Sequence, residues 1–128
     1  MTSPLYSLEV YHAMKKLREY YFRVIHNHLP HDLKHTCGVI LLNLFFSSVH
    51  HLAVIATTHD KGVKISAIKD FLLDYAVITD EIEFLVDARA VSFHQAEVMY
   101  KDIIDIEEQM GAFRKSLKNG CATPQSTE

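Results

Sequence analysis

The sequence contains few of the residues that interrupt helices. Only four glycines and three prolines occur in 128 residues, and Pro4 and Pro124 lie near the two ends. The interior is therefore almost free of helix breakers, which favours a few long helices over many short strands. Apolar residues make up 48% of the chain and charged residues 23%, the balance of an ordinary globular domain.

Cysteine is also scarce, and no long hydrophobic run is present. Cys37 and Cys121 are the only cysteines and have no metal-ligand spacing, which argues against a disulfide scaffold and fits a reducing compartment. The first residues lack the charged start and apolar run of a signal peptide. The longest apolar stretch, residues 37–49, is shorter than the roughly 20 residues that a membrane span needs. We therefore expect a cytoplasmic protein without membrane contact or cofactor.

Apolar periodicity predicts four helices. Apolar residues recur at three- and four-residue steps over residues 5–28, 32–59, 64–90 and 93–118. The connections are only a few residues long, so successive helices must run antiparallel. The sequence thus predicts an all-α fold, an antiparallel up-down-up-down four-helix bundle in residues 1–118. The polar residues 119–128 are expected to form a disordered tail.

Local signals predict where these helices begin and end. Pro30 ends the first helix, and Asp32 is the expected N-cap of the second. Gly62 suits a left-handed exit from the second helix. Ser92 and Gln95 have the spacing of a capping box at the start of the fourth. The middle of the second helix is apolar nearly all round, which predicts packing against both the core and a neighbouring subunit.

Charge is distributed unevenly along the chain. The net charge of −3 divides into +3 over residues 1–64 and −6 over residues 65–128. An up-down topology gathers nine of the thirteen basic residues at one end of the bundle. Such a cluster can displace counterions from a phosphate backbone, although cations near helix ends also serve solubility and the helix dipole. Lys69 belongs to this end, and the other eight are the candidates for RNA contact: Lys15, Lys16, Arg18, Lys61, Lys64, Arg114, Lys115 and Lys118.

Histidines collect at the opposite end, where most are expected to be solvated beside the turns. His31 and His35 have the four-residue spacing of a metal pair, but no third ligand has a matching spacing, so no metal site is predicted. The remaining members of this cluster are His26, His28 and His94.

One spacing resembles a catalytic motif. Arg89 and His94 are separated by four residues, as are Arg23 and His28, and helical ribonucleases of the HEPN type use an Arg-x(4–6)-His motif. Ala90 stands where that family usually has a polar residue. A HEPN-like ribonuclease using Arg89 and His94 is therefore an alternative function, while the preferred interpretation assigns no catalytic residue. The many carboxylates of the third and fourth helices are expected to form a solvated acidic face or a surface for a basic partner.

Several features in order along the chain carry a family resemblance. Leu29-Pro30 followed by Lys34 is similar to the first turn of a known bundle family. Ser92 and Gln95 match the Ser-x-x-Gln start of that family's fourth helix, after a third helix resembling residues 78–90. Residues 106–117 resemble its closing segment, in which glycines are followed by an aromatic and a basic residue. Here these are Gly111, Phe113 and Lys115, with Ala112 at a position where a second glycine is common.

From about Tyr6 to Leu117 the chain thus resembles the accessory variability determinant (Avd) of diversity-generating retroelements and the related ribosomal intervening-sequence proteins. The resemblance implies a homopentameric ring that binds a reverse transcriptase and RNA, or an RNA/DNA hybrid. It would support mutagenic reverse transcription without catalysis. Such relatives are usually strongly basic, whereas this chain is slightly acidic, which confines any RNA contact to the basic end. A third possibility is an oligomeric scaffold with protein partners only.

Overall fold

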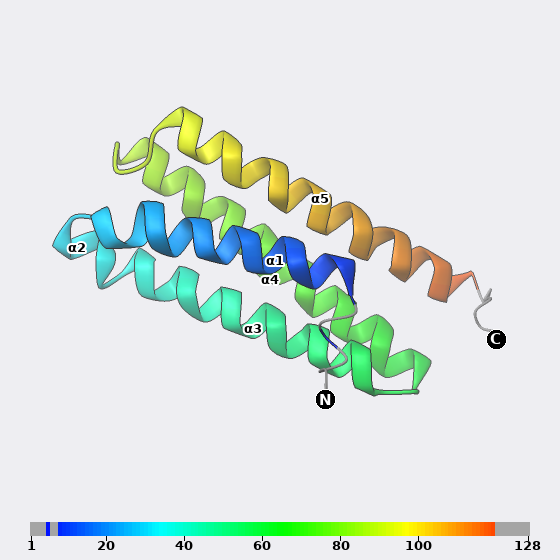
Figure 1. Cartoon of the computed structure of the whole chain (residues 1–128). Helices are drawn as coiled ribbons and strands as arrows, with labels where there is room; N and C mark the ends of the chain where they lie inside the picture. The colour runs from blue at the N-terminus through cyan, green and yellow to red at the C-terminus, as the bar shows by residue number, and fades with distance from the viewer. Residues whose placement is uncertain (1–4, 6–7, 120–128) are drawn as a thin grey trace.

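The computed structural model describes residue 5 and residues 8–119, which form helices joined by short connections. No β-strand occurs in this part of the chain. Four long helical segments pack against one another: α3 packs on α4, α4 on α5, α5 on α1, and α1 on α3. Figure 1 shows the start of α1, the α3–α4 connection and the end of α5 toward one end of the molecule. The short helix α2 and the α4–α5 connection lie at the other. The regular α-helices are α1 (Glu9–Tyr20), α2 (His31–Lys34), α3 (Cys37–Thr57), α4 (Lys61–Asp87) and α5 (Phe93–Lys118).

The first helical segment changes its winding before it ends. After α1 it continues as a π-helical segment, η2 (Tyr21–Ile25), and a 3₁₀ turn, η3 (His26–His28). A π-turn adds a residue to the usual helical turn. The side chains that face the core after Tyr21 are therefore Ile25 and His26, whereas Val24, where a regular helix would next return to the core face, is only half-buried. Leu29 is then extended before Pro30, as the proline requires.

Two of the predicted helix ends are wrong. Pro30, rather than Asp32, occupies the N-cap position of α2, and Asp32 lies in its first turn. At the other end of the molecule, the Asp60 carboxylate accepts a hydrogen bond from the backbone N–H of Val63 at 3.0 Å. This cap starts α4 at Lys61 and places Gly62 inside its first turn rather than at a left-handed exit.

Three further features concern where the helices break, begin and end. The second helical segment is divided at His35–Thr36, where the Thr36 hydroxyl donates to the Asp32 carbonyl at 2.7 Å. The capping box of α5 is present, with Ser92 and Gln95 each accepting from the other's backbone N–H at 3.0 Å. Of the tail predicted over residues 119–128, Asn119 is the C-cap of α5, and residues 120–128 lie outside the described residues.

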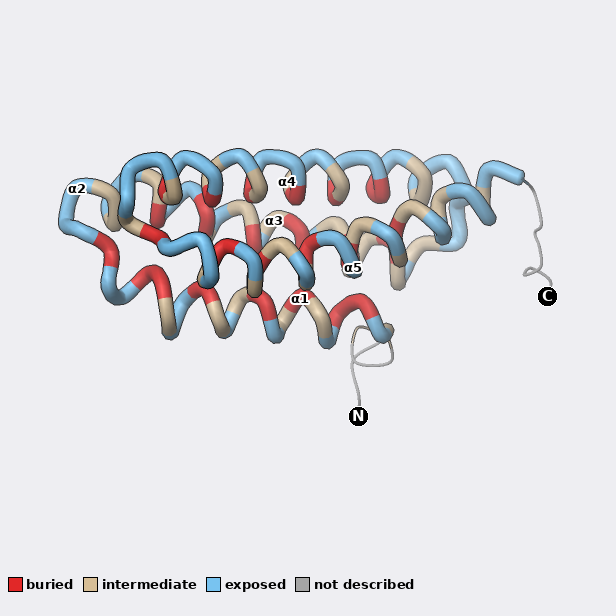
Figure 2. The backbone as a smooth tube through the Cα atoms, turned by 90° about the horizontal axis from the view of Figure 1, so that it is seen from above, coloured by how far each residue is buried: buried red, intermediate tan, exposed pale blue. Residues whose placement is uncertain are grey.

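The core runs along the whole axis between the helices. Figure 2 shows the buried positions on the inner side of each tube and the exposed positions facing outward. Aromatic and aliphatic side chains fill the centre, with Tyr21, Phe45, Phe71 and Tyr75 among the largest that are fully buried. Close packing of such side chains is the main source of stability in a bundle.

The helix α3 carries more apolar surface than the core uses. Val39, Ile40 and Phe46 are exposed on it. By length and composition alone, the segment His31–Thr57 would be apolar enough to cross a membrane, a test that core helices of soluble proteins also pass. Only 28% of its most apolar window is buried. Much of the apolar surface of α3 is thus uncovered in a single chain.

Candidate functional site

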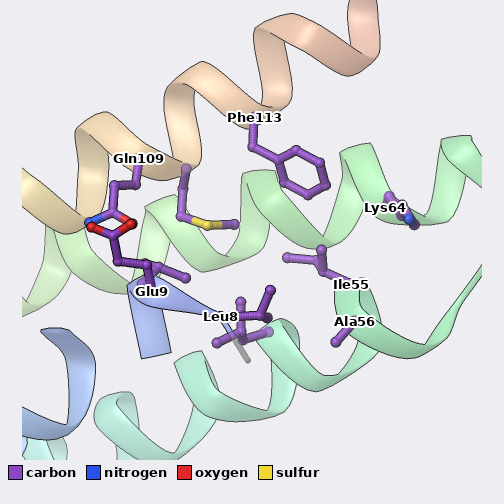
Figure 3. A pocket seen from close by; sticks show the side chains of 10 residues that line it. Leu8, Glu9, Ile55, Ala56, Lys64, Gln109 and Phe113 are labelled. Carbon is purple, nitrogen blue, oxygen red and sulfur yellow. The ribbon is translucent and has the colours of Figure 1, made fainter. Parts of the chain in front are cut away.

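The basic end of the bundle is organised around an apolar pocket. The pocket has a volume of about 410 Å³ and brings together the start of α1, the end of α3, the first turn of α4 and residues 109–113 of α5. In Figure 3, Phe113 and Ile55 line its interior, while Glu9 and Gln109 lie beside each other at one side. Lys64 lies at the opposite side. Helix ends that are distant in sequence therefore meet here.

Five of the eight candidate RNA-contacting residues belong to this end and are called the end group. Two lie in the first turn of α4 and three in the last turns of α5. Lys115 and Lys118 are exposed in the last turn of α5, where cations interact favourably with the helix dipole. A phosphate backbone can approach such exposed cations without desolvating the core. The end group consists of Lys61, Lys64, Arg114, Lys115 and Lys118.

The other three candidates, the α1 group of Lys15, Lys16 and Arg18, lie further along the bundle. The Lys16 ammonium is 3.6 Å from the carboxylate of Asp102 in α5. Asp102 and Lys118 are sixteen positions apart in α5, about 24 Å along its axis at 1.5 Å per residue. The structure therefore separates the predicted cluster into two groups.

Each member of the α1 group already has a neighbour within the chain. The Lys15 ammonium lies over the ring of Tyr11, 5.9 Å from its centroid. Arg18 lines a groove between α1 and α3 together with Phe22 and Phe46. These contacts leave the α1 group less available to a polyanion than the end group.

At the opposite end, His26 forms a buried polar contact that the sequence interpretation missed. Its side chain is 8% exposed, and its Nδ1 lies 3.1 Å from the hydroxyl of Tyr21. The same hydroxyl is 3.5 Å from the backbone carbonyl of Gly38, and the Phe22 ring stacks on the imidazole with centroids 5.4 Å apart. The π-turn carries His26 to the core face, and Gly38 has no side chain to block the ring. A glycine in the first turn of an apolar helix was the available signal for this close approach.

Burial lowers the pKa of His26, and the positive charges of Lys34 and His35 lower it further. The neutral ring is therefore favoured in the fold, and the folded pKa lies below the unfolded value of about 6.5. Below that value the unfolded chain binds a proton that the folded chain resists, so stability falls as pH decreases toward the folded pKa. We expect the wild type to lose more unfolding free energy between pH 7.5 and pH 5.5 than His26→Gln, measured by urea denaturation. The exposed His28→Gln is the control, and equal pH slopes for wild type and His26→Gln would contradict this role.

The remaining histidines form no enclosed centre. The rings of His31 and His35 lie 4.4 Å apart, as their spacing predicts, and both are exposed. Across residue 5 and residues 8–119, no group of three or more His, Cys, Asp or Glu side chains is placed to hold a metal ion. Burial and the nearby Glu81 carboxylate raise the pKa of the Cys37 thiol, which disfavours the reactive thiolate.

One histidine lies between a serine and an aspartate. The His51 Nε2 is 3.2 Å from the Ser47 hydroxyl and 3.5 Å from the Asp74 carboxylate. A catalytic triad uses one imidazole nitrogen for the serine and the other for the aspartate. Here both neighbours approach the same nitrogen, so the arrangement is suited to holding α3 against α4 rather than to activating the hydroxyl.

Arg89 and His94 lie close to the α4–α5 connection but outside any enclosed, deeply buried setting. Both side chains are exposed at the α4–α5 connection. A pocket of about 600 Å³ at this connection is lined by Arg89 and Phe93 but not by His94. The neighbouring pocket carries the carboxylates of Glu83, Asp87 and Glu97, which would repel an RNA phosphate. The geometry therefore gives the ribonuclease alternative no support.

The backbone of Arg89 is strained. Its φ is 63°, in the left-handed region, and the N–H groups of Arg89 and Ala90 close a Schellman motif onto the carbonyls of Val86 and Leu85. Glycine normally occupies this position, because a side chain there costs about 1–2 kcal/mol. We expect Arg89→Gly to raise the free energy of unfolding by about 1 kcal/mol, measured by urea denaturation. Ala88→Gly, one residue earlier in helical geometry, should lower it, and a destabilised Arg89→Gly would show that the arginine side chain matters more than the strain.

Comparison with known proteins gives no relative. No family model matches the chain, and no curated protein or solved structure is significantly similar to it. The likeness to Avd-type bundles therefore rests on the sequence features alone.

Proposed function

We propose that the chain is a non-catalytic accessory protein that binds a reverse transcriptase and RNA in a diversity-generating retroelement. In this proposal its helices run antiparallel, up-down-up-down, and five copies form a cytoplasmic ring. The observation that carries it is the Avd-like order of features over residues 6–117. Its helical architecture supports the proposal, because these features coincide with helix boundaries: Leu29-Pro30 ends the first segment, and Ser92 caps α5.

The proposed RNA contact is the end group, with the α1 group in a lesser role. The support for this is physical. Lys115 and Lys118 are exposed in the last turn of α5, and Lys61 is exposed in the first turn of α4. Exposed cations bind phosphate by counterion release. The remainder of the surface, with its acidic α4 and α5, suits contact with a protein rather than RNA. A small basic RNA contact beside larger acidic surfaces agrees with the slightly negative net charge of −3.

Two measurements test the proposal. The affinity for a labelled single-stranded RNA, measured by fluorescence anisotropy from 50 to 200 mM salt, should fall steeply with salt. The gene for the chain should lie beside a reverse-transcriptase gene, and the two proteins should copurify when coexpressed. RNA binding that is absent at 50 mM salt, together with no copurification, would rule out the proposed function.

A protein-only scaffold is the second candidate, and the exposed apolar residues of α3 favour it. Such a scaffold self-associates or binds proteins but shows no salt-dependent nucleic-acid binding. The anisotropy titration therefore separates the two candidates directly.

A further inference from the structure

A groove with an apolar floor runs between the first helical segment and α3. Its volume is about 560 Å³. Its floor is formed by Phe22, Leu42 and Phe46, with Phe46 59% exposed and Phe22 47% exposed. The groove follows the contact between α1 and α3, two neighbouring helices of the bundle. Aromatic side chains this exposed are unusual on a surface that faces only water.

The rim of this α1–α3 groove is mainly basic. Arg18 and Arg23 line it, together with a single carboxylate from Glu19. An apolar floor with two guanidinium groups fits an amphipathic helix whose apolar face is flanked by carboxylates.

The same chain exposes such a helix face on α4. Leu73, Val77 and Phe84 are all exposed and follow one another at steps of four and seven residues, which places them on one side of the helix. This row of three residues is the α4 stripe. Asp70 and Asp80 share its side of the helix, being three to four residues from stripe members.

The charges bordering the α4 stripe are predominantly negative. Asp87 also borders the stripe, three residues after Phe84. Lys69, four residues before Leu73, is the one cation of α4 on this border. The stripe therefore presents apolar anchors at helical spacing with an acidic border, the complement of the α1–α3 groove in both polarity and charge.

The groove and the stripe of one chain cannot meet each other. In the packing order α1–α3–α4–α5, α1 and α4 lie diagonally across the bundle. The stripe is exposed on the outside of α4, and the groove opens on the outside of the α1–α3 pair. A second copy, however, carries the same stripe and can present it to the groove.

We propose that the α1–α3 groove of one copy receives the α4 stripe of a second copy. The contact joins two different faces, so it is heterologous, and repetition of it gives a closed ring or an open chain of subunits. This inference deepens the proposed function, because it names the faces through which the assembly forms. It also accounts for the exposure of Phe46, one of the apolar residues of α3 that the single chain leaves uncovered.

The test uses two variants that each damage one face. Phe46→Asp places a carboxylate in the groove, and Leu73→Asp places one in the stripe. Ile104→Asp is the matched control, since Ile104 on α5 is exposed to the same 54% as Leu73 but belongs to neither face. All three positions are exposed, and circular dichroism with thermal unfolding verifies that each variant folds.

Mass is measured by light scattering after size exclusion, at a concentration where the wild type is assembled. Phe46→Asp and Leu73→Asp should each run as single chains of 14.7 kDa, and Ile104→Asp should keep the wild-type mass. An equimolar mixture of the two face variants should form a particle of about 29 kDa, twice the chain mass, and nothing larger. In this mixture the Leu73→Asp chain keeps an intact groove and the Phe46→Asp chain keeps an intact stripe. A heterologous contact can join one chain of each kind, and the damaged faces prevent a third chain from binding.

Several results overturn the inference. These are a wild type that stays monomeric, a face variant that keeps the wild-type mass, a control that dissociates, or a mixture that stays monomeric. RNA affinity measured on the same samples keeps the two claims separate. A wild type that binds RNA and assembles, with face variants that still assemble, would reject these faces while leaving the proposed function intact.

Discussion

Replacing Gly38 with leucine should destabilise the fold by about 3 kcal/mol. A Cβ atom at Gly38 would lie 3.1 Å from the His26 Cε1 and Nδ1 atoms and 3.4 Å from a methyl group of Leu29. The larger leucine side chain must displace the imidazole. Overpacking of this kind costs about 1–3 kcal/mol, and losing the buried Tyr21–His26 hydrogen bond adds about 1–3 kcal/mol. Urea denaturation of wild type and variant measures the difference.

Gly111 supplies a matched control on α5. A Cβ atom at Gly111 would meet nothing within 4 Å among the described residues. Gly111→Leu should therefore be neutral or raise stability by up to about 1 kcal/mol, because glycine is a poor helix former. If Gly38→Leu is no less stable than Gly111→Leu, the packing of His26 on Gly38 does not hold the first segment to α3.

Reversing three charges of the end group should weaken RNA binding about 50-fold at ~0.15 M salt. For a single-stranded polyanion, each phosphate neutralised contributes about −0.7 to the slope of log affinity against log salt. Losing three contacts should therefore make this negative slope less steep by about 2. The variant is Arg114→Glu combined with Lys115→Glu and Lys118→Glu. Fluorescence anisotropy with labelled single-stranded RNA at several salt concentrations measures both quantities.

Two controls accompany this triple variant. Lys101→Glu, an exposed reversal in the middle of α5, should change affinity much less. A triple reversal of the α1 group should also have the smaller effect, because Lys16 already faces Asp102 at 3.6 Å. An end-group variant that folds, by circular dichroism, and keeps wild-type affinity and salt slope would show that RNA does not bind at this end.

The helical architecture could be predicted because local signals and apolar periodicity agree. In α5 the seam from Ala96 to Met110 is buried as the three- and four-residue steps require, and the capping box starts the helix. The π-turn at Tyr21–Ile25 could not be read in the same way, because an inserted residue leaves the apolar composition unchanged and shifts only the register. At Asp60 and Gly62 two competing signals were present, and the side-chain cap determined the boundary.

The candidate site could be predicted only in part, for a different reason. Topology places helix ends at one pole, which correctly joins Lys64 of α4 to residues 109–113 of α5. It does not say how far α1 extends along the bundle, so Lys16 was grouped with residues about 24 Å away. The burial of His26 depends on the π-turn and on Gly38 together, two features from different segments that no single-segment pattern contains.

The native mass of the purified chain in solution tests the central claim most directly. Light scattering after size exclusion should give about 74 kDa, five times the 14.7 kDa chain, for the proposed Avd-like ring. A single-chain mass of 14.7 kDa at every concentration would contradict the ring and remove the main support for an accessory function of this type.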